Sequence, residues 1–233
     1  MKIFTAEQIR AIDKATIKSE PVSSVDLMER AAGAMFRYID IHVPRTEKIT
    51  LFAGPGNNGG DALALARMMK GKGYNIKVLI INEGSSFSED FTINLKRLEA
   101  TGAEIISAGT DSLAEAGTSS VIIDGIFGSG LSRPVSGIAG SAIRIINCSR
   151  ARIISVDIPS GLFCDGTMPA EPDAVVHASE TLTFQFPKLP FMTEEGCRFA
   201  GEWHILDIGL SADAVEKEQT PYLYITREDV IPL

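Results

Sequence analysis

The stretch Leu51-Phe-Ala-Gly-Pro-Gly-Asn-Asn-Gly-Gly-Asp-Ala-Leu-Ala-Leu-Ala66 joins an apolar run to a helix-forming run through a glycine-rich bend. A bend of this kind at the start of a helix directs several backbone N–H groups toward one anion. Two adjacent amides, Asn57 and Asn58, and the carboxylate of Asp61 lie in the same bend. The stretch therefore predicts a strand-to-helix turn that binds a phosphate-bearing ligand and takes part in its chemistry.

The same bend allows two other interpretations. Its letters Gly54-Pro-Gly-Asn-Asn-Gly59 match the G-x-G-x-x-G dinucleotide fingerprint. That fingerprint also needs an acidic residue about 20 residues further on that binds a ribose, and Glu83 is suitably placed. A nicotinamide-dependent dehydrogenase is therefore one alternative. The other is a purely structural turn in which Asp61 stabilises the start of a helix.

Two further loops repeat the arrangement of an apolar strand, an aspartate and a glycine-containing turn. Val121-Ile-Ile-Asp124 continues through a glycine-rich bend to Pro134, and Ile153-Ile-Ser-Val-Asp157 continues to Gly161. In open α/β sheets, ligands bind outside the carboxyl ends of the strands. If the sheet is parallel, Asp61, Asp124 and Asp157 are expected to face one crevice.

Strand-helix alternation along the chain predicts the α/β class. We expect one domain over residues 1–233, a three-layer αβα sandwich with a Rossmann-like, mostly parallel sheet and helices on both faces. Capping patterns at Thr5-Ala-Glu-Gln8 and Ser23-Ser-Val-Asp26 predict two helices before the first strand. No helix is evident between the last two strands, so a hairpin-like edge is expected there. The predicted strands are 49–53, 76–81, 104–107, 120–124, 152–156, 180–185 and 202–207, and the later helices are 58–72, 88–101 and 136–147.

The loop motifs are similar to those of the YjeF N-terminal domain family, the NAD(P)H-hydrate epimerases. The similarity covers nearly the whole chain, and Ala62 is a mild departure because the family often has glycine there. The segments that carry the resemblance are Ala6–Asp13, Leu27–Gly33, Asn57–Asp61, Asp124–Pro134, Asp157–Gly161 and Thr183–Lys188.

The resemblance implies repair of damaged nicotinamide cofactors. The expected reaction interconverts the R and S forms of hydrated NADH and NADPH at C6 of the nicotinamide ring, and feeds a dehydratase that accepts only the S form. Loss of the hydroxyl leaves an iminium-like cation, and water then adds to either face. The resemblance places Asp157 against the substrate, and we expect it to act as the acid and base. That role needs a raised pKa, through burial or a like-charged neighbour such as Asp124; the alternative is a carboxylate that only accepts loop N–H bonds.

The resemblance also implies the remaining ligands. A potassium ion is expected at Asn58, Asp124 and Ser160, whose oxygen atoms are the donors that a hard cation prefers. Lys188 matches a family lysine that orients substrate; alternatively, Lys188 is a solvent-exposed charge on a loop. Arg133 is either a phosphate ligand or part of an exposed loop. The expected substrate-binding residues are Asn57, Asn58, Gly59, Gly60, Asp61, Gly128, Ser129, Gly130, Leu131, Ser132, Arg133, Pro134 and Asp157.

Composition narrows the class of protein. The net charge of −8 argues against a nucleic-acid surface. No apolar run approaches the roughly 20 residues of a membrane helix. The three cysteines, Cys148, Cys164 and Cys197, have no metal-type spacing and indicate reduced thiols in a cytoplasmic protein. The three histidines are scattered, so a zinc site is not expected.

The resemblance suggests partners and one more alternative. A homodimer is common in the family, and an ADP- or ATP-dependent dehydratase is often fused downstream. Residues 220–233 resemble the junction before that domain, although a free-standing epimerase is equally open. Related domains also occur as non-catalytic dimerisation modules that bind nucleotide or RNA. Such modules usually lose the Asn-Asn-Gly-Gly-Asp motif and the later aspartate, and this chain retains both.

Overall fold

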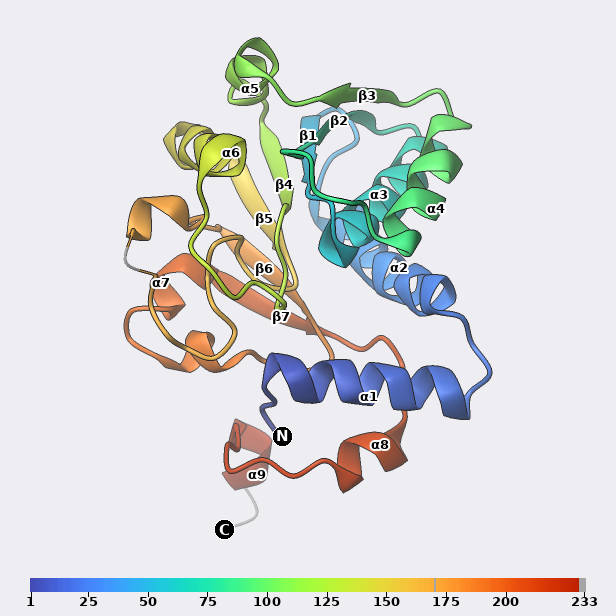
Figure 1. The fold of residues 1–233 in the computed structure, drawn as a ribbon, viewed down its shortest axis with the longest axis vertical. Helices are drawn as coiled ribbons and strands as arrows, with labels where there is room; N and C mark the ends of the chain where they lie inside the picture. The colour runs from blue at the N-terminus through green and yellow to red at the C-terminus, as the bar shows by residue number, and fades with distance from the viewer. Residues whose placement is uncertain (170, 231–233) are drawn as a thin grey trace.

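Seven parallel strands form one sheet in the computed structural model, which describes residues 1–169 and 171–230 (Figure 1). Their order across the sheet is β3-β2-β1-β4-β5-β6-β7, and every neighbouring pair is parallel. The strands are β1 (Lys48–Ala53), β2 (Asn75–Ile80), β3 (Glu104–Ser107), β4 (Val121–Gly125), β5 (Arg152–Val156), β6 (Glu180–Phe184) and β7 (Glu202–Leu206). The predicted strands are confirmed to within a residue or two.

Helices separate most of these strands. The capping boxes predicted at Thr5 and Ser23 are present and begin α1 and α2. The short helix α5 was not predicted. The helices are α1 (Ala6–Ser19), α2 (Ser24–His42), α3 (Asn57–Gly71), α4 (Glu89–Glu99), α5 (Thr110–Ala116), α6 (Gly137–Cys148), α7 (Cys197–Ala200), α8 (Ala212–Lys217) and α9 (Arg227–Val230).

Helices α2, α3 and α4 cover one face of the sheet, and α5 and α6 cover the other (Figure 1). The side chains of successive strand residues therefore pack into two different hydrophobic cores, one on each face of the sheet. Ile123 packs with the α2–α4 layer, whereas its neighbour Ile122 packs with α5 and α6. Burial on both faces explains why the strands read as continuous apolar runs rather than alternating ones. The predicted three-layer αβα sandwich is confirmed.

The predicted hairpin-like edge is wrong. Strand β7 lies parallel to β6, with Glu202 opposite Glu180. The connection over residues 185–201 contains only a 3-10 turn, Leu189–Met192, and the four-residue helix α7. Elements this short give no periodic apolar pattern, which is why the crossover was not evident in the sequence.

The first residues of the chain and helix α9 lie beside each other below α1 (Figure 1). An isolated antiparallel bridge joins Lys2 to Leu223. Part of the predicted junction, residues 231–233, lies outside the described residues. Within residues 1–169 and 171–230, no helix combines the length and apolar character needed to cross a bilayer.

Candidate active site

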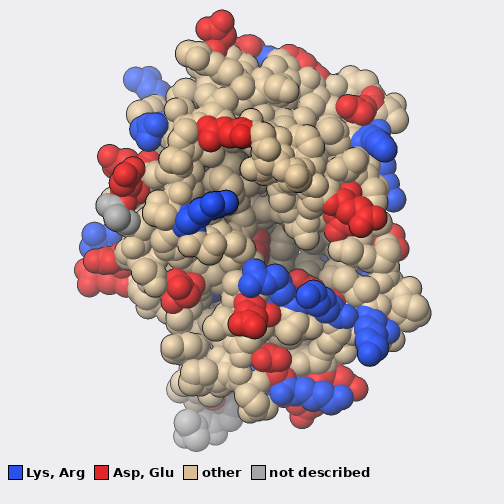
Figure 2. Space-filling view, in the orientation of Figure 1, with Lys and Arg blue, Asp and Glu red and all other residues tan. Residues whose placement is uncertain are grey.

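The site lies where the strand order changes direction. From β1 the chain goes outward to β2 and β3 on one side, then returns to β4 on the other side of β1. Such a switch point opens a crevice at the carboxyl ends of the strands. Helix α1 crosses this end of the sheet (Figure 1), and the face is hollowed there, with acidic side chains inside (Figure 2).

The hollow is a cavity of about 520 Å³ between α1, α3 and the loops that follow β4, β5, β6 and β7. Of the predicted substrate-binding residues, those that line it are Asn57, Asn58, Asp61, Gly128, Ser129, Gly130, Leu131, Ser132, Arg133 and Asp157. Gly59 and Gly60 lie behind its wall, and Pro134 lines an adjoining cavity. The three separate loops therefore meet, as the sequence predicted, although their roles remain predictions.

The turn after β1 is built for close packing. A Cβ atom on Gly54 would lie 1.9 Å from the carbonyl oxygen of Ile126, and one on Gly59 would lie 1.8 Å from that of Gly54. Only glycine allows this loop to touch the loop after β4. Helix α3 starts at Asn57 with no side-chain cap. Its first N–H groups lack intrahelical acceptors and are available to an anion.

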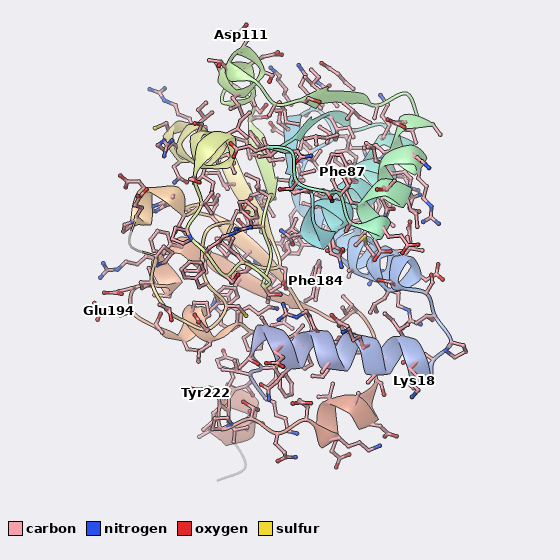
Figure 3. All side chains as sticks on the ribbon, viewed as in Figure 1. Lys18, Phe87, Asp111, Phe184, Glu194 and Tyr222 are labelled. Carbon is pink, nitrogen blue, oxygen red and sulfur yellow. The ribbon has the colours of Figure 1, made fainter. Side chains whose placement is uncertain are left out.

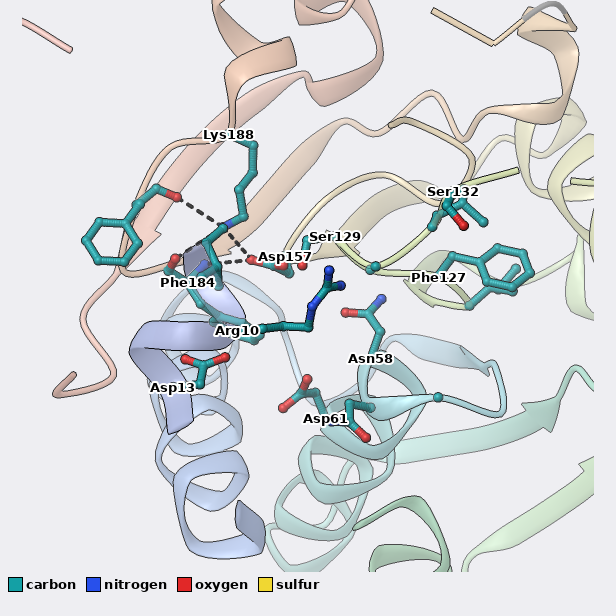
Figure 4. Close-up of a pocket in the computed structure, with 18 of the residues that line it drawn as sticks. Arg10, Asp13, Asn58, Asp61, Phe127, Ser129, Ser132, Asp157, Phe184 and Lys188 are labelled. Atoms are coloured by element: carbon teal, nitrogen blue, oxygen red, sulfur yellow. Dashed lines mark hydrogen bonds and ion pairs between the residues drawn. The ribbon is translucent and has the colours of Figure 1, made fainter. Parts of the chain in front are cut away.

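Asp157 follows β5 in a left-handed conformation, with φ of +64°. Asparagine and aspartate tolerate this region better than most residues, yet it is strained and is typical of functional sites. Its backbone N–H donates to Leu182. Its carboxylate accepts from the Phe184 N–H at 3.1 Å and forms an ion pair with Lys188 at 2.7 Å (Figure 4). Asp157 is thus held at the cavity wall by the loop after β6.

Lys188 is buried, with 1% of its side chain exposed. Besides Asp157, its ammonium group donates to the Thr183 hydroxyl and to the carbonyls of Phe184 and Phe186, at 2.8 to 3.2 Å. A solvated loop charge, the alternative left open by the sequence, is excluded.

Asp124 does not line the cavity, which corrects the expectation that three aspartates open onto one crevice. It is fully buried. One oxygen accepts from the Ser160 hydroxyl and the Ile126 N–H, and the other accepts from Ser155 and the Ser160 N–H. Burial raises its pKa, and the hydrogen bonds from Ser160 and Ser155 oppose that rise. Asp124 therefore ties the loops after β4 and β5 together behind the cavity.

Asp13 and Asp61 are the acidic neighbours of Asp157 instead. Burial raises the pKa of Asp13 to about 6, with a further contribution from Asp157 and an opposing one from Lys188. Burial also raises the pKa of Asp61 well above its ordinary value, reinforced by Asp157 and then Asp13. Neither carboxyl group has a hydrogen bond or an ion pair to another described residue. The sequence did not identify Asp13 as a site residue, although it lies one helical turn after Arg10, which also lines the cavity.

Apolar side chains line the cavity alongside Asp157 and its charged neighbours. They come from α1 and from the exits of β6 and β7: Ile9, Phe184, Phe186, Ile208 and Leu210. The first three lie in segments that carry the family resemblance, whereas the last two lie outside those segments. The glycine- and serine-rich loop after β4 also lines the cavity, which therefore offers apolar contacts suited to a ring and a loop suited to a phosphorylated group.

Glu83 does not line this cavity. Its carboxylate accepts a hydrogen bond from the Ile138 N–H in the first turn of α6. The acid that a dinucleotide-dependent dehydrogenase would direct at a ribose is thus already engaged with a helix terminus. This contact weakens the dehydrogenase alternative.

Comparison with known proteins gives a consistent result. The profile of the family described as "YjeF-related protein N-terminus" matches residues 24–190. An NAD(P)H-hydrate epimerase of Oenococcus oeni is 36% identical over 209 residues, which are 89% of this chain and 96% of that protein. A bifunctional NAD(P)H-hydrate repair enzyme of Moorella thermoacetica is 29% identical, over 90% of this chain but 41% of its own length. Among solved structures, yeast ynu0 superposes with a TM-score of 0.79 over 98% of both chains, and its 21% identity supports the fold alone.

Proposed function

This chain belongs to the family of YjeF-related protein N-termini, and we propose that it is an NAD(P)H-hydrate epimerase. It is an isomerase that interconverts the R and S forms of hydrated NADH and NADPH at C6 of the nicotinamide ring. The observation that carries the proposal is Asp157, which lines the cavity together with apolar side chains and pairs with buried Lys188. An ionised carboxylate in such surroundings suits a reaction that passes through a ring cation.

The proposed reaction breaks and re-forms one bond. The lone pair of the ring nitrogen expels the C6 hydroxyl, which takes up a proton and leaves as water. Asp157 stabilises the resulting iminium-like cation by its charge and exchanges a proton with the departing or arriving water. The apolar side chains around it would hold the ring and limit competing water.

The nucleotide part is proposed to lie along the loop after β4 and the start of α3. Backbone N–H groups there, together with the helix dipole, favour a diphosphate even in a protein with a net charge of −8. Arg133 is exposed at the cavity and would add a cation beside the phosphates. Asn57, Asn58 and Asp61 would contact the substrate from the first turn of α3.

The expected potassium ion fits the donor types present. Asp124 and Ser160 are in contact, and the Asn58 amide oxygen accepts no hydrogen bond from a described residue, so it is available to a cation. The Ser160 hydroxyl has one proton and two acceptors within reach, Asp124 and the Phe127 carbonyl. Donation to Phe127 frees oxygens of Asp124 and Ser160 for a cation. A cation bound there would offset nearby acidic charge and fix the two loops.

We also propose the biological setting. The chain would act in the cytoplasm as a homodimer beside an ADP- or ATP-dependent dehydratase, fused or separate. Three free cysteines support a reducing compartment. The bifunctional repair enzymes among its relatives support the dehydratase, and exposed apolar side chains near the chain ends, such as Leu223 and Ile225, offer a contact surface. Size measurement in solution, alone and with the dehydratase, tests both contacts.

The assay that tests the activity uses mixed R and S hydrates and an S-specific dehydratase. With this protein added, both forms should be consumed completely, faster than the uncatalysed interconversion allows. Persistence of the R form at the uncatalysed rate would contradict the proposal. Nucleotide or RNA binding without turnover would favour the non-catalytic module, and hydride transfer to a carbonyl would favour the dehydrogenase.

A further inference from the structure

Inversion at a ring carbon requires chemistry on both faces of the ring. The hydroxyl leaves from one face and, for the configuration to change, water must arrive on the other. A carboxyl group on one face can assist departure and return on that face only. Two groups on opposite sides of the cavity are therefore needed if both directions are assisted.

Asp13 and Asp157 come from opposite walls. Asp13 projects from α1, whereas Asp157 projects from the loop after β5, and the Arg10 side chain of α1 extends past Asp157 toward Asn58 (Figure 4). Arg10 is exposed and has no hydrogen bond or ion pair to any described residue, so a ring can displace it. Apolar side chains from α1 and from the exits of β6 and β7 complete this part of the cavity. A planar ring bound between α1 and the loop after β5 would have one carboxyl group on each side.

The two carboxyl groups differ in a way that suits opposite tasks. Asp157 has two partners, the Lys188 ammonium group and the Phe184 N–H. Asp13 has no such partner, and its pKa is raised to about 6 by burial, with Asp157 adding and Lys188 opposing. Arg10, Lys14, Asp61 and Asp90 are the other charged groups that line the adjoining cavity with it. Asp13 therefore carries a proton more readily than an ordinary aspartate.

We propose that Asp13 is the second catalytic residue, which serves the ring face opposite Asp157. In one direction Asp13 gives its proton to the hydroxyl, the C6–O bond breaks, and water leaves as the C6–N double bond forms. Water from the cavity then attacks C6 on the other face and gives a proton to Asp157. Asp13 ends ionised and Asp157 protonated, which is the starting state for the reverse inversion. Proton exchange with solvent in the cavity returns the proton to Asp13 and leaves Asp157 ionised.

This inference rests on the proposed epimerase activity, and oxygen-18 water separates the two. Each purified epimer of hydrated NADH is incubated in labelled water with wild type, Asp13→Asn, Asp157→Asn and Asp111→Asn. Asp111 lies on α5, at the far end of the molecule (Figure 3), and serves as the matched control. Both label uptake and inversion are measured after the epimers are separated, and NADH binding and thermal unfolding report on folding.

Wild type and Asp111→Asn should invert both epimers with uptake of label. Asp13→Asn should invert at least about 100-fold more slowly, yet one epimer should still take up label without inversion, because Asp157 serves its face. Asp157→Asn should show the same behaviour with the other epimer. Inversion by Asp13→Asn at the wild-type rate, or equal loss of exchange in both epimers, would overturn the assignment of Asp13. Absence of inversion by wild type would instead overturn the epimerase proposal.

Discussion

Polar side chains are paired with one another at the amino end of the sheet, whereas several are unpaired at its carboxyl end. At the amino end, Arg152 begins β5 and Glu180 begins β6, and they form two hydrogen bonds, at 2.5 and 2.8 Å. Tyr38 donates to the same carboxylate, and Lys77 bridges two further glutamates. At the carboxyl end, Asp13 and Asp61 have no partner among the described residues, and Asp157 is strained.

This difference shows where the chain leaves interactions to be completed by a ligand. Buried or half-buried polar groups are normally paired, and unpaired ones need an explanation. The amino end is paired within the chain, so it serves stability. The carboxyl end holds unpaired carboxyl groups, a buried amide without a partner and an uncapped helix start around one cavity. A cationic intermediate would satisfy the carboxyl groups, and the oxygen atoms of a phosphorylated ligand would satisfy the helix start and the amide nitrogen.

Removal of Lys188 should give the largest effect. Lys188→Met leaves the carboxylate of Asp157 buried without its cation, and breaking one half of a buried pair destabilises a protein by about 3 kcal/mol or more. The matched variant at the amino end, Lys77→Met, breaks pairs with exposed glutamates and should lower stability by less than about 1 kcal/mol. Urea unfolding measures both. Equal losses would mean that the two ends do not differ as described.

The pH dependence of stability sharpens the comparison. Below about pH 4 the Asp13 carboxyl group is protonated in both the folded and the unfolded protein. Between its ordinary pKa of 3.8 and its folded pKa of about 6, only the folded protein holds the proton. Stability therefore falls as pH rises through this window, by about 1 to 3 kcal/mol, and stays lower above it. Asp13→Asn should remove that fall. A wild-type minus variant difference that is flat from pH 4 to 7, measured by urea unfolding, would contradict it.

Substitution at the amino end should give the smallest effect, and an opposite pH trend. Burial alone would raise the pKa of Glu180, but hydrogen bonds from Arg152 and Tyr38 outweigh it and lower the pKa. That stabilisation is present above the ordinary value of 4.5 and is lost as pH falls through the folded pKa. Arg152→Gln should lower stability by about 1 kcal/mol near pH 7 and leave epimerisation unchanged. Loss of turnover with intact folding would show that this end also contributes to catalysis.

The sequence predicted the strands and the convergence of the loops because these depend on local patterns. Apolar runs buried on both faces are easily recognised in a sequence. Gly59 is required by a contact within its own bend, with Gly54, and Gly54 is required by a contact with Ile126 in the loop after β4. The parallel β6–β7 crossover was missed because its helices are four residues long.

The roles of individual aspartates depend on distant partners and were harder to predict. Asp124 and Asp157 end similar apolar runs in the sequence, but Asp124 lies within β4 and Asp157 follows β5. Asp124 is enclosed by two serines, whereas Asp157 is paired with Lys188, 31 positions along the chain. Asp13 comes from a helix outside the strand-loop pattern altogether. Only the fold brings α1 over the carboxyl end of the sheet, and no local signal reports that placement.

The central claim, that Asp157 at the carboxyl end of the sheet carries epimerisation, is tested most directly by the rate at which one purified hydrate converts to the other. Asp157→Asn keeps the size and the tolerance for a left-handed backbone, so NADH binding should change little. The turnover number of Asp157→Asn should be at least about 100-fold below that of wild type, and that of Arg152→Gln should equal it. Wild-type turnover by a folded Asp157→Asn protein would show that Asp157 does not carry the reaction.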